Sequence, residues 1–81
     1  MKRTGFPLYR VAVGALPDGT PVIVSGGGYV DGTVQVWRLS DGTPLVPSLH
    51  LPELVQDVAI HGDIIVTAIG SDISVHQLAL P

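Results

Sequence analysis

The chain has 81 residues and a formal net charge of −3, so it can form one small domain and lacks clustered basic residues for nucleic-acid phosphates. It has no cysteine, which excludes disulfides, thiolate nucleophiles and cysteine-based zinc sites and fits a reducing, cytoplasmic location. Hydrophobic residues make up 46% of the sequence and charged residues 14%, and this apolar balance predicts self-association.

The first half of the chain predicts four strands. Short runs rich in Val and Ile, bounded by Gly, Pro and Asp, are typical of strands, whereas the spacing of an amphipathic helix is absent. We expect strands at about 8–16, 21–25 and 33–39, with a weaker fourth strand at about 45–49. Pro47 makes this last strand an edge strand, because proline cannot donate a ladder hydrogen bond.

The second half repeats this order with three strands, at about 54–60, 64–69 and 73–78. Placing Trp37 over His76 aligns the two halves at a spacing of 39 residues. A period near 40 with several short strands in each unit is typical of propeller blades. The second unit lacks a fourth strand, and the N-terminal tail is the only segment left to supply one.

The segments LPDG (16–19), VIVSG (22–26), DGTVQVW (31–37) and DGTP (41–44) follow one another in the first half. They resemble blades of WD-repeat β-propellers, of the kind found in bacterial repeat proteins, and the second half follows the pattern in a degenerate form. The resemblance implies an all-β fold with two blades. In this reading residues 1–7 are a tail that can close a neighbouring blade, 8–50 form blade one, and 51–81 form blade two without its fourth strand.

The family fixes each blade with a structural tetrad of His, Ser or Thr, Asp and Trp. Such a network satisfies buried polar groups and sets the blade register. The first blade matches three of the four positions, and the second carries His in place of Trp. The matching residues are Ser25, Asp31 and Trp37 in blade one and His50, Thr67, Asp72 and His76 in blade two.

Three sequence patterns could indicate a catalytic, metal-binding or phosphate-binding site, but each is better explained by a structural role. His50, Thr67 and Asp72 are the residue types of a hydrolase triad, but Thr67 lies in an apolar strand rather than an exposed cleft. The three histidines are not paired at metal-ligand spacing. The glycines at 26–28 lack both the phosphate-loop pattern and a following helix. We therefore expect no catalytic residue, no metal and no cofactor, and predict that the chain is not an enzyme.

Four residues are candidates for partner binding: Arg10, Tyr29, Glu53 and Gln56. Tyr29 lies beside glycines, where an exposed aromatic ring can anchor a partner or pack over a neighbouring blade. The other three lie near the starts of the innermost strands. In the family this is the channel mouth, where partners often dock, although ordinary solvated loop polarity explains them as well.

Two blades do not close a propeller, which needs about 4–8 of them. We expect three or four copies to join head-to-tail into a ring; the alternatives are a C-terminal piece of a longer propeller and a strand-swapped dimer. The expected function is a non-catalytic scaffold for protein interactions, with the chain itself and other proteins as partners. The sequence favours neither nucleic-acid nor membrane binding. A small-ligand or glycan-binding propeller is the alternative function.

Overall fold

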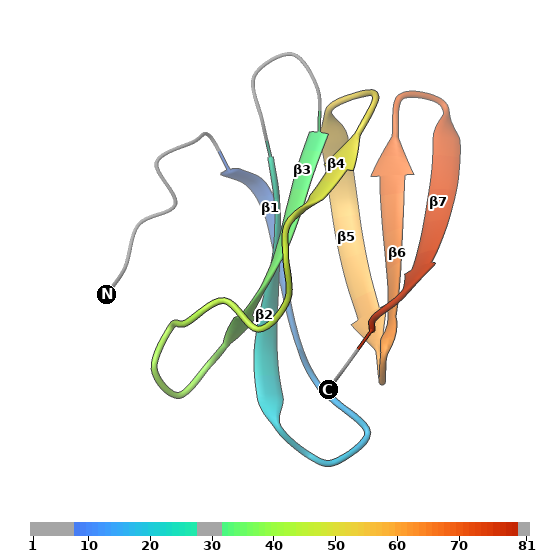
Figure 1. Ribbon diagram of the computed structural model, residues 1–81. Coiled ribbons are helices and arrows are strands. Elements are labelled where there is room, and N and C mark those ends of the chain that lie inside the picture. The colour runs from blue at the N-terminus through green and yellow to red at the C-terminus, as the bar shows by residue number, and fades with distance from the viewer. Residues whose placement is uncertain (1–7, 28–31, 80–81) are drawn as a thin grey trace.

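The computed structural model describes residues 8–27 and 32–79, which form two antiparallel sheets (Figure 1). Sheet one has the order β1-β2-β3-β4, and sheet two has the order β5-β6-β7, so the all-β class is confirmed. Within the described ranges there is no helix, and hence none that is long and apolar enough to cross a bilayer. The strands are β1 (Leu8–Ala15), β2 (Pro21–Gly27), β3 (Gly32–Arg38), β4 (Leu49–Leu51), β5 (Val55–His61), β6 (Ile64–Ile69) and β7 (Asp72–Gln77).

The fourth strand lies later in the chain than the sequence pattern predicts. After the β3 turn the chain stays beside β3, because the Leu45 amide donates to the Val36 carbonyl at 3.0 Å. Pro47 then has no amide hydrogen to donate, and regular pairing resumes only at Leu49. As a result β4 ends at Leu51, so sheet one extends one residue beyond the expected unit boundary at residue 50.

Two Asp-Gly-Thr turns are built alike. The Thr20 amide donates to Asp18 at 2.9 Å, and the Thr43 amide donates to Asp41 at 3.1 Å. The glycine between them has a positive φ in each turn, 92° and 71°. The hydrogen bond from the Thr20 amide lowers the pKa of Asp18, and bonds from the Thr43 hydroxyl and amide lower the pKa of Asp41.

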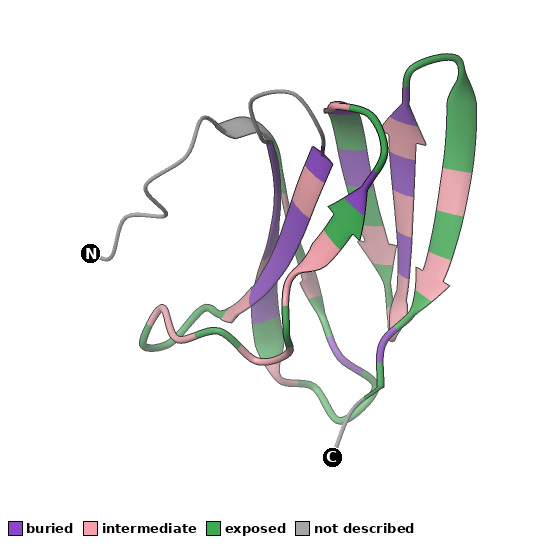
Figure 2. Cartoon of the chain, turned by 45° about the horizontal axis from the view of Figure 1, so that its top comes forward, coloured by how far each residue is buried: buried purple, intermediate pink, exposed green. Residues whose placement is uncertain are grey.

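The core lies between the two sheets, where buried positions of the central strands alternate with more exposed ones (Figure 2). Val22, Val24 and Ile65 are completely buried. The core residues are Val22, Val24, Val34 and Val36 from sheet one, Val55, Val58, Ile65 and Ile69 from sheet two, and Leu16, Leu51 and Leu78 beside the strands.

Glycines on sheet one allow sheet two to pack closely against it. A β-carbon added at Gly14 would lie 2.5 Å from Ile60 Cγ2, and one added at Gly26 would lie 2.6 Å from Val55 Cγ1. A side chain at either position would therefore require the facing side chain, Ile60 or Val55, to shift. The missing side chains are part of the fit between the sheets.

The first three strands of sheet one and the three strands of sheet two share one register. Ile23 pairs with Trp37 across β2 and β3, and Ile65 pairs with His76 across β6 and β7. Trp37 and His76 thus occupy matching positions at the expected spacing of 39 residues. The two sheets are two versions of one structural unit, and in the described part of the chain only sheet one has a fourth strand.

Candidate functional site

An open pocket of about 340 Å³ lies where β1 and β5 begin. Both strands are irregular at this point: the register of β1 against β2 shifts between Leu8 and Arg10, and that of β5 against β6 shifts between Val55 and Asp57. Such bulges turn side chains away from their regular directions and are frequent next to functional sites. The pocket is lined by Arg10, Leu54, Val55 and Gln56.

The pocket combines an apolar floor with a polar rim. Val55 is buried and Leu54 is half-buried, whereas Arg10 and Gln56 are exposed. A guanidinium and an amide beside apolar side chains can bind a carboxylate or a peptide group while its apolar part covers Leu54. The structure therefore brings together Arg10 and Gln56, two of the candidate partner-binding residues.

The other two candidates do not line this pocket. The Glu53 carboxylate packs over the β6–β7 turn, so that a β-carbon added at Gly70 would lie 2.5 Å from its Oε2 atom. Glu53 therefore covers a turn and does not face the pocket. Tyr29 lies outside the described residues.

A buried polar network lies on the face of sheet one that points away from sheet two. The Trp37 indole donates to Ser25 Oγ at 2.9 Å, and Ser25 Oγ in turn bonds the Gln35 carbonyl at 3.5 Å. Gln35 Nε2 donates to the Val46 carbonyl at 2.8 Å, and Ser48 Oγ donates to Gln35 Oε1. The network joins β2 and β3 to the segment that leads to β4. Its role is structural, because each of these polar groups binds its neighbours.

Sequence reasoning placed Ser25 and Trp37 together but missed Gln35, which is 7% exposed. The signal was present, because strand side chains alternate and Gln35 lies on the same face as Trp37. Asp31, the third residue expected in this network, lies outside the described residues.

The matching position in sheet two has a different network. Thr67 Oγ1 donates to the Ser74 carbonyl at 3.5 Å, as Ser25 does to Gln35 in sheet one. His76 Nε2 bonds the Ser74 hydroxyl at 2.7 Å and not Thr67. Asp72 accepts the Ile73 amide at 3.0 Å and lies at the surface. Ser74 is the partner that the family pattern did not indicate.

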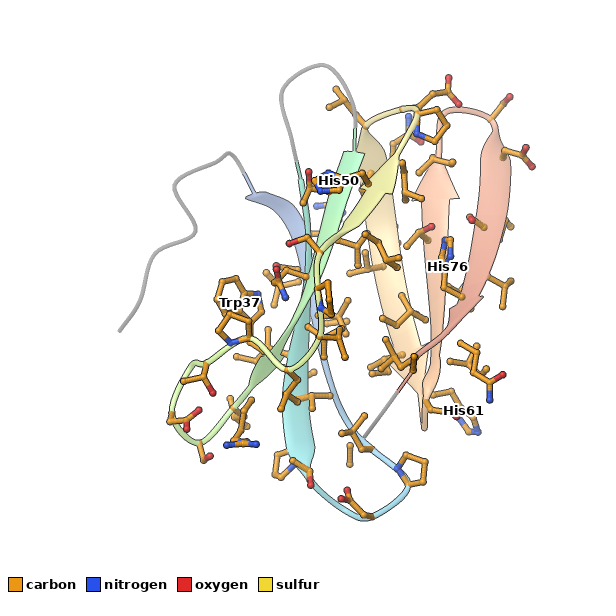
Figure 3. All side chains as sticks on the ribbon, viewed as in Figure 1. Trp37, His50, His61 and His76 are labelled. Carbon is orange, nitrogen blue, oxygen red and sulfur yellow. The ribbon has the colours of Figure 1, made fainter. Side chains whose placement is uncertain are left out.

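His50 does not join the other residues predicted for the second tetrad. It lies in β4 opposite Thr33, on the outer side of sheet one, and it is exposed. Figure 3 shows His50 on sheet one and His76 on sheet two. Because Thr67 faces the inner side of sheet one, that sheet separates it from His50. No hydrogen bond between described residues links His50 to Thr67, Asp72 or His76.

Replacing Trp37 with Phe should lower the free energy of unfolding by about 1 kcal/mol, because Ser25 Oγ loses its indole donor while most of the ring volume remains. Urea unfolding of the parent, of Trp37→Phe, of Ser25→Ala and of the variant that carries both changes gives the coupling energy between the two side chains. We expect the double variant to lose less stability than the sum of the single losses. Additive losses would show that the hydrogen bond contributes nothing.

In the described part of the chain, no three His, Cys, Asp or Glu residues are placed to hold a metal ion together. Comparisons with known protein families, curated proteins and solved structures find no match for this chain. The resemblance to WD-repeat blades therefore rests on the sequence segments alone, and the structure adds two sheets that share one register.

Proposed function

We propose that this chain is a non-catalytic propeller unit of the WD-repeat type, which assembles into a homo-oligomer of three or four copies and acts as a scaffold for protein interactions. The observation that carries the proposal is that two similar sheets pack together while each leaves apolar side chains exposed on its outer side. Val11 and Val13 on sheet one are 56% and 66% exposed, and Ile73 and Val75 on sheet two are 69% and 64% exposed.

A closed ring accounts for these uncovered faces. Each additional sheet in a stack covers one apolar face and presents another, so only closure leaves none exposed. Three or four two-sheet copies give six or eight blades, within the range of about 4–8 that propellers use. A ring also repeats the pocket at Arg10 and Gln56 around one rim, where a protein partner can contact several copies together.

Native mass spectrometry tests the assembly. We expect a discrete species at three or four times the chain mass of 8.5 kDa. The interaction surface is tested by a pull-down with wild-type protein and the Gln56→Ala variant, with Ser40→Ala, on the exposed turn after β3, as the control. A partner retained by wild type and the control but lost by Gln56→Ala supports the scaffold. A cooperatively folded monomer contradicts the homo-oligomer.

The pocket itself favours a second function, which is binding of a small acidic ligand or a glycan. Its volume of about 340 Å³ is at the lower end of the range typical of small-molecule sites. A ligand that binds only the folded state raises its melting temperature. A thermal-shift panel of carboxylates and oligosaccharides would identify such a ligand, and Arg10→Ala should abolish the shift.

A further inference from the structure

The contact between the two sheets is made by two different faces. Sheet one contributes the face that carries Val24 and Val36, and sheet two contributes the face that carries Val58, Ile60 and Ile65. Because the two sheets share one register, each of these faces has a counterpart on the other sheet. Both counterparts carry exposed apolar side chains, Val11 and Val13 on sheet one and Ile73 and Val75 on sheet two.

The uncovered face of sheet one matches the buried face of sheet two. Cross-strand pairs place Val11 opposite Ser25 and Val13 opposite Ile23, as Val58 lies opposite Thr67 and Ile60 opposite Ile65. We define face A as the outer side of sheet one. Its residues in the strands are Val11, Val13, Ile23, Ser25, Thr33, Gln35, Trp37 and His50.

The uncovered face of sheet two matches the buried face of sheet one in the same way. Val66 pairs with Ala59 and Val75, as Val24 pairs with Ala12 and Val36. We define face B as the outer side of sheet two. Its residues in the strands are Asp57, Ala59, His61, Ile64, Val66, Ala68, Ile73, Val75 and Gln77.

We propose that face B of one copy packs on face A of the next copy, and so repeats between copies the contact that the two sheets make within each copy. This inference assumes the homo-oligomer proposed above and assigns its interface. In the contact between copies, face B occupies the position that the inner side of sheet one has within a copy. Face A occupies the position that the inner side of sheet two has.

Side-chain sizes differ between the two contacts. Within one copy, Ile60 packs on Gly14 and Val58 packs close to Gly26. The counterparts between copies are Val13 on His61 and Val11 on Ala68. Because His61 and Ala68 carry side chains where sheet one has glycines, we expect the sheets of neighbouring copies to lie farther apart at this point than the two sheets of one copy do.

In the described part of the chain, the ionisable side chains of the two faces lie toward their edges. His50 lies on face A in the edge strand β4, opposite Thr33. On face B, Asp57 pairs with Ala68 at the irregular start of β5, and His61 is the last residue of that strand. All three residues are exposed. The central part of the contact is therefore apolar, and these three side chains remain at its edges, where water reaches them.

Two variants that block one face each test the assignment. Val13→Asp places a charge on face A, and Val75→Asp places one on face B; both positions are exposed, so each chain should still fold, as circular dichroism can verify. Native mass spectrometry should show each variant alone as a monomer. An equimolar mixture should form a heterodimer and no larger species, because each variant retains the face that the other has lost.

Other arrangements give different results. If like faces met in a symmetric dimer, one variant would assemble as wild type does and the mixture would form no heterodimer, which overturns the assignment. If the wild-type protein is an oligomer and neither variant disrupts it, the assignment of the interface to faces A and B is wrong. The proposal of a homo-oligomer is then still supported. A wild-type monomer overturns both proposals.

Cysteine cross-linking tests the same contact without relying on variants that dissociate the copies. The natural sequence has no cysteine, so the double variant Val11→Cys, Ala68→Cys carries the only thiols. We expect oxidation to give a ladder of covalent multimers that reducing agent removes. The matched control Val11→Cys, Asp41→Cys, whose second thiol lies on an exposed turn away from face B, should stay at the mass of one chain. A ladder in the control alone contradicts the assignment.

Discussion

Replacing Ile65 with Ala should lower the free energy of unfolding by about 2–5 kcal/mol. Ile65 is fully buried in β6, the central strand of sheet two, and it faces the core between the sheets. Its partners in the ladder are Ile60 and His76 on the two flanking strands. Truncating the Ile65 side chain leaves a cavity between strands on both sides, and the surrounding side chains can fill little of that cavity. A chain of this length has a total stability of roughly 4–12 kcal/mol, so the variant loses a large part of it.

The measurement is urea unfolding followed by circular dichroism, at a concentration where native mass spectrometry gives the same species for variant and parent. Ile65→Val is the matched control, because it removes one carbon and should cost about 0.5–1.5 kcal/mol. Equal losses for the two variants would mean that Ile65 does not fill a packed core.

Replacing Gly32 with Ala should cost about 3 kcal/mol, the upper end of the usual range for overpacking. The new β-carbon would clash with the Glu53 carbonyl oxygen and lie 3.0 Å from Val55 Cγ2. A backbone oxygen cannot rotate away as a side chain does, so the connection between β4 and β5 or the start of β3 must shift. The entropy that alanine removes from the unfolded chain offsets only about 0.4–1 kcal/mol of this cost.

Gly14→Ala is the control for this variant. The three atoms nearest to its β-carbon all belong to Ile60, with the closest at the end of a side-chain branch and the next at 3.7 Å. Because Ile60 is half-buried and can change rotamer, we expect a cost below about 1.5 kcal/mol. Thermal and urea unfolding of both variants should therefore give a clear difference. Similar costs would show that the Glu53 oxygen does not limit the space at Gly32.

The strand pattern could be predicted from the sequence because its signals are local. Alternating Val and Ile residues and the Asp-Gly turns mark six of the strands to within one or two residues. The position of β4 was wrong, because Pro47 interrupts pairing and only the partner strand shows where pairing resumes. Tertiary register decides such an element, and local composition does not.

The candidate site was only partly predictable, for a related reason. The sequence placed Arg10 and Gln56 at strand starts, but the two bulges that form the pocket depend on cross-strand register. The Trp37–Ser25 bond follows from the family pattern, whereas the contacts of Gln35 and Ser74 depend on which carbonyl or hydroxyl lies nearby. His50 matched the pattern in type but belongs to the other sheet.

The connection between the two sheets is short, since only residues 52–54 separate β4 from β5. A short tether holds two surfaces at an effective concentration in the millimolar range, well above the concentration of a second molecule in most solutions. Each chain therefore docks its own sheets before it meets another copy, and the sheet of a neighbour does not compete for that contact. In the homo-oligomer that we propose, the contacts between copies should dissociate first on dilution, and the two docked sheets of each chain should persist as the unit that re-forms the assembly.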